Sequence, residues 1–126
     1  MAQSAKKILL VDDNNEVREL LALFTKRLGY KVFEAATGLE AIDLASTVQP
    51  DLIMMDLRLP EMNGAEATAC LKANPSTRDI PVLVTTAHVA GIDTQRALNA
   101  GASEILHKPI DVTTLSNVLR RYLPAS

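Results

Sequence analysis

The sequence predicts a doubly wound α/β domain built around a five-stranded parallel sheet. Segments typical of strands and of helices alternate five times along the 126 residues, which is the pattern of consecutive βα units. Three strand segments, 8–11, 52–55 and 82–84, are apolar throughout, as expected for strands that are buried on both faces. The length favours one domain, so we expect a single domain over residues 1–126 with its core at about 6–123.

The strand segments also suggest the order of the sheet. Strands are expected near 7–11, 31–35, 51–56, 81–86 and 103–107. The second of these alternates between polar and apolar residues, which suits an edge strand. Right-handed crossovers with the three apolar strands in the centre give the order 2-1-3-4-5. The topological switch point, where such sheets bind ligands, then lies between the first and third strands.

The first and last helices have the clearest apolar faces. Residues 17–28 carry an apolar stripe at helical spacing, and Gly29 is typical of the position after a helix; the stripe is Val17, Leu20, Leu21, Phe24 and Leu28. The last helix should begin after an N-cap at Asp111, and its apolar face is Val112, Leu115, Val118, Leu119, Tyr122 and Leu123.

Helix-breaking residues mark the three helices between them. The second is expected from Leu39 to Val48, before Pro50, because proline does not continue a helix. The third should start after Gly64, and the fourth should cover residues 92–99 and end at Gly101.

Three carboxylates and one lysine follow the strand segments directly. Asp12 and Asp13 come after the first strand, Asp56 ends the third, and Lys108 follows the fifth. Parallel strands bring these side chains to one edge of the sheet. Acids held close together repel one another and need a cation, and oxygen ligands suit Mg²⁺. A lysine at the same edge offers a charge for a phosphoryl group.

The composition excludes several other classes of protein. The net charge is −2, and no cluster of basic residues indicates a nucleic-acid partner. Cys70 is the only cysteine, so no intramolecular disulfide is possible, and we expect it to be a small buried thiol. No signal peptide or membrane-spanning run is evident. We therefore expect a cytoplasmic protein without a membrane partner.

With these motifs in place, the chain resembles the receiver domains of two-component response regulators. The resemblance covers about residues 6–123 and rests on Asp12-Asp13-Asn14, Pro50-Asp51, Met55-Asp56, Leu59-Pro60, Asn63-Gly64, Thr86-Ala87, Gly101-Ala102 and Lys108-Pro109. Each motif alone is weak, but together they are highly specific because they occur in order at the expected strand ends. The resemblance implies a CheY-like, flavodoxin-like fold.

The resemblance also implies a role for each site residue. Asp56 matches the phosphoacceptor and a metal ligand. Asp13 matches the acid that binds Mg²⁺ directly, Asp12 the acid that reaches it through water, and Arg58 the residue whose backbone carbonyl is a further ligand.

Two further side chains match residues that contact the phosphoryl group. Lys108 corresponds to the lysine that pairs with the acceptor, and Thr86 to the hydroxyl that turns inward to bind a phosphoryl oxygen. The resemblance further implies a cis peptide bond between Lys108 and Pro109.

Three positions depart from the usual pattern or leave a property open. Ile105 stands where family members often carry tyrosine or phenylalanine, so the usual coupled motion of an aromatic ring with the threonine is not available. Arg58 and His88 occupy positions that are associated with the lifetime of the phosphoryl group, but this pair does not predict a lifetime.

The expected function is therefore a phosphorylation-dependent switch. A histidine kinase or a histidine phosphotransfer protein would supply the phosphoryl group, and the modified domain would bind a protein target that the sequence does not identify. The domain would catalyse only its own modification, as a monomer or weak dimer.

Other interpretations explain single residues but not the whole pattern. Asp13 and Glu16 could form a capping box, Asp56 could be an ordinary turn residue, and Lys108 a solvated lysine. An aspartyl phosphatase is the alternative function, but it requires a second Asp where Arg58 stands. A flavin carrier would need a phosphate loop without acids. His88 and His107 lack metal-ligand spacing and should be exposed or partly packed.

Overall fold

A computed structural model describes residues 5–88 and 91–124. The strands are β1 (Lys7–Val11), β2 (Lys31–Ala35), β3 (Leu52–Asp56), β4 (Val82–Thr86) and β5 (Glu104–His107). They form a parallel sheet in the order β2-β1-β3-β4-β5. The predicted fold class and strand order are thus confirmed, and the strand bounds agree to within one residue.

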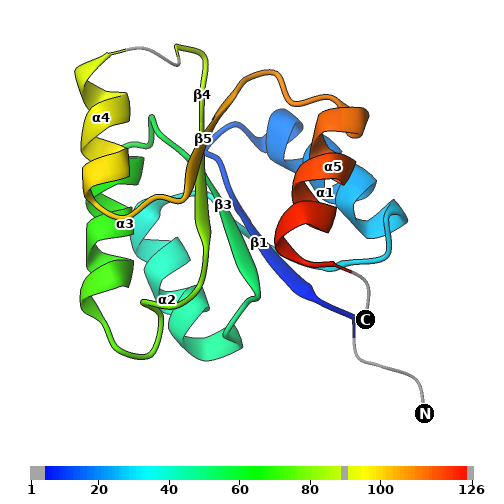
Figure 1. The fold of residues 1–126 in the computed structure, drawn as a ribbon, viewed down its shortest axis with the longest axis horizontal. Coiled ribbons are helices and arrows are strands. Elements are labelled where there is room, and N and C mark those ends of the chain that lie inside the picture. The colour runs from blue at the N-terminus through cyan, green and yellow to red at the C-terminus, as the bar shows by residue number, and fades with distance from the viewer. Residues whose placement is uncertain (1–4, 89–90, 125–126) are drawn as a thin grey trace.

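The helices form two layers, one on each face of the sheet (Figure 1). They are α1 (Asn15–Arg27), α2 (Gly38–Val48), α3 (Gly64–Ala73), α4 (Ile92–Asn99) and α5 (Val112–Tyr122). The α1 and α5 helices cover one face, and α2, α3 and α4 cover the other. None of the helices in the described ranges is both long and apolar enough to span a bilayer.

Alternate residues of each central strand supply the two halves of the core. Side chains of Leu9, Ile53 and Val82 pack under α2, α3 and α4. Those of Ile8, Leu52 and Leu83 pack under α1 and α5, because successive strand residues point to opposite faces. The β3 and β4 strands are buried at every position. Their polar C-terminal residues, Asp56 and Thr86, are therefore buried as well.

The apolar faces of α1 and α5 are buried only in part. Leu20 of the α1 stripe is 52% exposed and Leu28 is 37% exposed, whereas Ala22 and Thr25 are buried. Leu20 instead lines an open groove between α1 and the segment after β5. In the same way, Val112 at the start of α5 is exposed, while Leu115, Val118 and Leu119 are buried.

The prediction of a buried Cys70 was wrong, because this residue is exposed. The buried α3 positions are Gly64, Ala65, Ala67, Thr68 and Leu71, most of them at the spacing of one helix face. Cys70 precedes Leu71 and therefore points away from that face.

The N-cap predicted for α5 is confirmed, and the alternative interpretation of Asp13 as the cap of α1 is not. Asp111 accepts a hydrogen bond from the Thr114 backbone N–H at 2.7 Å and caps α5, as predicted. The α1 cap is Asn14, whose side chain accepts from the Val17 N–H at 3.0 Å. Asp13 therefore does not cap this helix, and a capping role does not account for its carboxylate.

Candidate functional site

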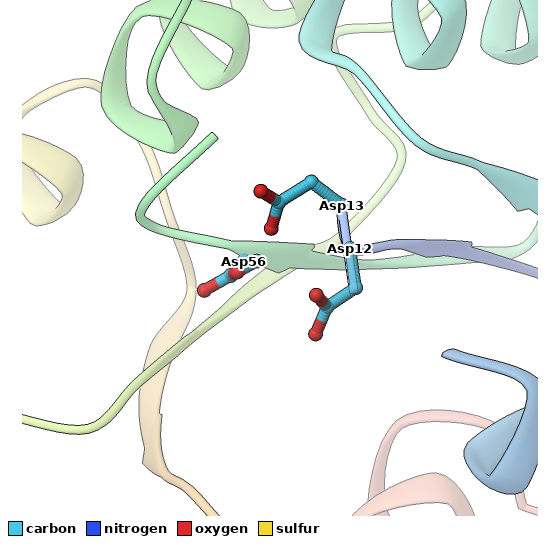
Figure 2. A group of neighbouring side chains, drawn as sticks. All are labelled: Asp12, Asp13 and Asp56. Atoms are coloured by element: carbon cyan, nitrogen blue, oxygen red, sulfur yellow. The ribbon is translucent and has the colours of Figure 1, made fainter. Parts of the chain in front are cut away.

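Three acids meet at the C-terminal edge of the sheet. Asp12 and Asp13 follow β1 directly, and Asp56 is the last residue of β3. Val11 lies opposite Met55 in the sheet register, so the two strands end side by side. One carboxylate oxygen from each acid lies within 4.8 Å of the others. Figure 2 shows that the side chains of the neighbours Asp12 and Asp13 leave the chain in different directions.

The three carboxylates differ in burial. Asp12 and Asp56 are only 4% and 6% exposed, and Asp13 is exposed. Burial raises the pKa of Asp56, because a charge is poorly solvated there. The positive charge of Lys108 opposes this shift and the negative charge of Asp12 adds to it, and the net result is a raised pKa. A cation beside Asp56 would therefore favour its ionised form.

Lys108 supplies one such positive charge. Its Nζ lies 2.9 Å from Asp12 Oδ2 and 3.5 Å from Asp56 Oδ2. Burial lowers the pKa of Lys108, but its hydrogen bond to Asp12 and the charges of both acids outweigh burial and raise it. The lysine is therefore held positively charged between the two buried acids. The Lys108–Pro109 peptide bond is cis, as the family resemblance implied.

The donor set fits a hard divalent cation. Three acids within reach of one another carry more negative charge than one lysine neutralises, and all their ligand atoms are oxygens. The turn after Asp56 folds back against this acid, with the Arg58 N–H 3.4 Å from Asp56 Oδ1. Arg58 therefore lies in the turn that directly follows Asp56, and its backbone carbonyl belongs to this turn. The Arg58 side chain is exposed.

Thr86 lies at the same edge, but its hydroxyl is bonded to the loop that follows β4. Thr86 Oγ1 donates to the His88 carbonyl at 3.2 Å and accepts from the His88 N–H at 3.1 Å. Thr94 of α4 donates to the same His88 carbonyl at 3.3 Å. The structure therefore connects the Thr86 hydroxyl to α4 through one peptide unit.

The two histidines agree with their predicted status as residues outside the site. The side chains of His88 and His107 are both exposed. The acidic cluster contains neither of them.

The sequence analysis missed one supporting residue, Arg18, and named a second, Gly64, only as a motif residue before a helix. Arg18 on α1 donates to the backbone carbonyl of Asp12 at 2.6 Å, and Gly64 approaches the Asp56 carbonyl so closely that a Cβ there would lie 2.5 Å from it. The position of Arg18, a basic residue in the first turn of the helix after the two acids, could have indicated its role. Its partner Glu34 on β2, however, lies 16 residues further along the chain. For Gly64 the Asn63-Gly64 motif was visible in the sequence, but the close approach was not, because the neighbouring backbone belongs to Asp56 and Leu57.

Comparisons with known proteins agree with this geometry. A family model described as the response regulator receiver domain matches residues 8–120. The polar-differentiation response regulator DivK of Brucella ovis is 36% identical over 118 residues, which cover 94% of this chain and 96% of DivK.

Solved receiver structures are similar throughout. The receiver domain of sensor histidine kinase PA1611 from Pseudomonas aeruginosa, with a magnesium ion coordinated in its active site cleft, is 32% identical with a TM-score of 0.89, covering 97% of this chain and 100% of that one. The chemotaxis protein CheY4 of Vibrio cholerae is 30% identical with a TM-score of 0.90, covering 95% and 100% of the two chains. The chain therefore belongs to the response regulator receiver domain family, the phosphoryl-accepting switches of two-component signalling.

Proposed function

We propose that Asp56 accepts the phosphoryl group and that Lys108 and Thr86 bind its oxygens. The observation that carries this proposal is the arrangement of Asp56 beside Asp12 and Asp13, with Lys108 Nζ 3.5 Å from Asp56 Oδ2. A nucleophilic carboxylate needs compensation for the charge that accumulates during transfer. Lys108 lies where it can supply part of that compensation.

The transfer would be an in-line displacement. An oxygen of the Asp56 carboxylate forms the new bond to phosphorus while the phosphorus–nitrogen bond of a phosphohistidine breaks. The donor imidazole leaves with the bonding electron pair, and Asp56 becomes an acyl phosphate. Water later hydrolyses this mixed anhydride. Lys108 remains protonated throughout, which its raised pKa favours.

The acidic cluster is proposed to bind Mg²⁺ for this reaction. Asp13 and Asp56 would bind the ion directly, Asp12 through water, and the Arg58 backbone carbonyl would be a further ligand. When bound, Mg²⁺ supplies positive charge to the oxygens of the phosphoryl group. Two or three carboxylates with waters make a modest site rather than a dedicated cage, so we expect weak binding.

The phosphoryl donor is proposed to be a histidine kinase or a histidine phosphotransfer protein that docks beside α1. A mostly apolar groove of about 310 Å³ runs between α1 and the segment after β5. Lys108 is among the residues that line it, along with Val17, Leu20, Phe24, Pro109 and Ile110. Docking over this groove, near Asn15, would let the donor imidazole reach Asp56.

We further propose that residues 6–123 form one cytoplasmic switch domain that acts through an unidentified protein target. The protein would turn over no metabolite and would be a monomer or weak dimer. The aspartyl phosphatase alternative remains disfavoured, because Arg58 stands where its general acid would be and its side chain is exposed. Sustained hydrolysis of a small phosphate ester that depends on Asp56 would support that alternative instead.

Intact-mass measurement after incubation with acetyl phosphate and Mg²⁺ tests the proposal. The wild-type chain should gain one phosphoryl group, and Asp56→Asn should gain none. Asp43→Asn makes the same chemical change at an exposed position of α2 and should be modified like the wild type. Modification of Asp56→Asn at a rate similar to that of the wild type would contradict the assignment.

A further inference from the structure

The Arg18 side chain has three fixed partners beside the acidic cluster. It is only 13% exposed. Its Nε donates to Glu34 Oε1 at 3.1 Å, its Nη1 to the Asp12 carbonyl at 2.6 Å, and its Nη2 to Asn15 Oδ1 at 2.9 Å. The planar guanidinium thus joins β2, the end of β1 and the start of α1, a geometry that an ammonium group does not reproduce.

The contact to the Asp12 carbonyl concerns both acids at once. This carbonyl belongs to the peptide unit that joins Asp12 to Asp13, and the two side chains leave that unit in different directions (Figure 2). A rotation of this peptide plane changes one backbone dihedral angle at each of the two acids, and with it the direction in which each side chain leaves the backbone. The Asp12 N–H, which belongs to the preceding peptide unit, donates to the Ala35 carbonyl at 3.1 Å. Arg18 therefore holds only the peptide unit between Asp12 and Asp13.

The two carboxylates depend on this peptide unit to different degrees. The Asp12 carboxylate has ties of its own, to the Asn14 N–H at 2.9 Å and to Lys108 at 2.9 Å. The Asp13 side chain is exposed, so its direction follows the backbone more closely. The effect of losing Arg18 should therefore fall mainly on Asp13.

We propose that Arg18 is a positioning residue for the metal site, which fixes the Asp12–Asp13 peptide plane so that both carboxylates face the cation. This inference rests on the proposed Mg²⁺ site. It does not follow from charge, because a positive guanidinium near a cation site weakens cation binding by simple electrostatics. Geometry and charge thus predict opposite signs when Arg18 is removed.

Mg²⁺ titration by calorimetry, without any phosphoryl donor, separates the two effects. Arg18→Ala should raise the Mg²⁺ dissociation constant by about tenfold, the low end for the loss of a residue that orients metal ligands. Arg18→Lys keeps the charge but not the fork and should also bind Mg²⁺ more weakly. Unchanged or tighter binding in Arg18→Ala, or wild-type binding in Arg18→Lys, would overturn the proposal.

Arg121→Ala is the matched control. Arg121 on α5 forms an ion pair with Glu104 on β5 at 2.9 Å, and neither residue belongs to the acidic cluster. The Mg²⁺ affinity of Arg121→Ala should therefore equal that of the wild type. An equal loss of affinity in this variant would show a general effect of lost ion pairs and overturn the proposal. If Arg18→Ala does not fold, urea unfolding will show it, and Arg18→Lys then decides the question.

A spectroscopic measurement adds a readout that stability alone does not change. The carbonyl ¹³C resonance of Asp12 should shift in Arg18→Ala without Mg²⁺ and stay in place in Arg121→Ala. No shift in the Arg18 variant would contradict a fixed peptide plane. If the wild-type chain itself bound no Mg²⁺, the proposed function would fail and this inference with it, whereas normal wild-type binding with no effect of Arg18 would remove the inference alone.

Discussion

Lys108 lies closer to Asp12 than to Asp56. Its Nζ is 2.9 Å from Asp12 Oδ2 and 3.5 Å from Asp56 Oδ2. The Lys108 ammonium group therefore pairs with Asp12 of the acidic cluster. The same group lies within reach of Asp56, the proposed acceptor. A phosphoryl group on Asp56 would compete with Asp12 for the same charge, so this one side chain would link the proposed metal site to the proposed modification site.

The stability of the protein without metal should report the raised pKa of Asp56. Burial is the main cause of this shift, so the folded state binds the proton more tightly than the unfolded state. The ionised carboxylate then destabilises the fold as pH rises through the folded pKa. Asp56→Asn should have a higher free energy of unfolding than the wild type at neutral pH. The difference should vanish below the usual aspartate pKa of 3.8.

Urea unfolding in EDTA at several pH values measures this difference. Asp43→Asn, at an exposed position, should change stability little at any pH. A less stable Asp56→Asn at neutral pH would show that the ion pair with Lys108 outweighs burial.

Mg²⁺ affinity should depend on Asp13 more than on Asp12. The Asp12 carboxylate already has two hydrogen-bond partners, whereas Asp13 is exposed. Asp13→Ala should remove most of the Mg²⁺ affinity and leave the fold intact or more stable, since it relieves repulsion between acids. Titration of Asp13→Ala and Asp12→Ala side by side checks this order, and wild-type affinity in Asp13→Ala would refute it.

Gly64 should tolerate no side chain, because its backbone lies against that of the acceptor. A Cβ at this position would be 2.5 Å from the Asp56 carbonyl oxygen, so the β3–α3 turn would have to move. Gly64→Ala should lower the free energy of unfolding by about 1–3 kcal/mol, the usual range for overpacking. Gly38→Ala is the control, because the nearest atom to its Cβ is 3.1 Å away, and it should cost less. Equal stability of the two variants in urea would contradict this reason for the glycine.

Phosphorylation should change the loop after β4 more than β5. Thr86 cannot bind a phosphoryl oxygen and keep both of its bonds to His88, and Ile105 has no ring that could change place with it. Residues 87–91 follow Thr86 in the sequence, and positions 89 and 90 lie outside the described residues. Beryllofluoride, a phosphoryl mimic, should alter hydrogen exchange most within residues 86–99 and less at 104–107. The largest change at β5, with 86–99 silent, would contradict this route.

Thr94→Val tests whether the route reaches α4 through the His88 carbonyl. The variant keeps the shape of the side chain but loses the hydroxyl that bonds that carbonyl at 3.3 Å. The response of α4 to beryllofluoride should shrink, while the response near Thr86 remains. An undiminished response of α4 would show that the coupling takes another path.

The residues at the strand ends could be predicted because their positions follow from local patterns. Apolar runs such as 52–55 define buried parallel strands, and the sheet order brings Asp12, Asp13 and Asp56 together without further information. Thr86 was placed at the right edge, but the direction of its hydroxyl depends on a loop whose conformation has no local signature.

Features that depend on contacts between distant segments could not be predicted. The exposure of Leu20 depends on the groove between α1 and the segment after β5, and that of Cys70 on which face of an alanine-rich helix meets the sheet. The guanidinium of Arg18 is held in part by Glu34, which lies on the edge strand β2. The sequence does not indicate that these two residues meet. These properties arise from packing, which sequence spacing alone does not specify.

The most direct test of the central claim locates the phosphoryl group itself. An acyl phosphate is a mixed anhydride that borohydride reduces to an alcohol, so a phosphorylated aspartate becomes homoserine. After incubation with acetyl phosphate and Mg²⁺, followed by borohydride, peptide mapping should find homoserine at position 56 and at no other aspartate. Homoserine at another aspartate, or none in a chain that has gained a phosphoryl group, would contradict the assignment of Asp56.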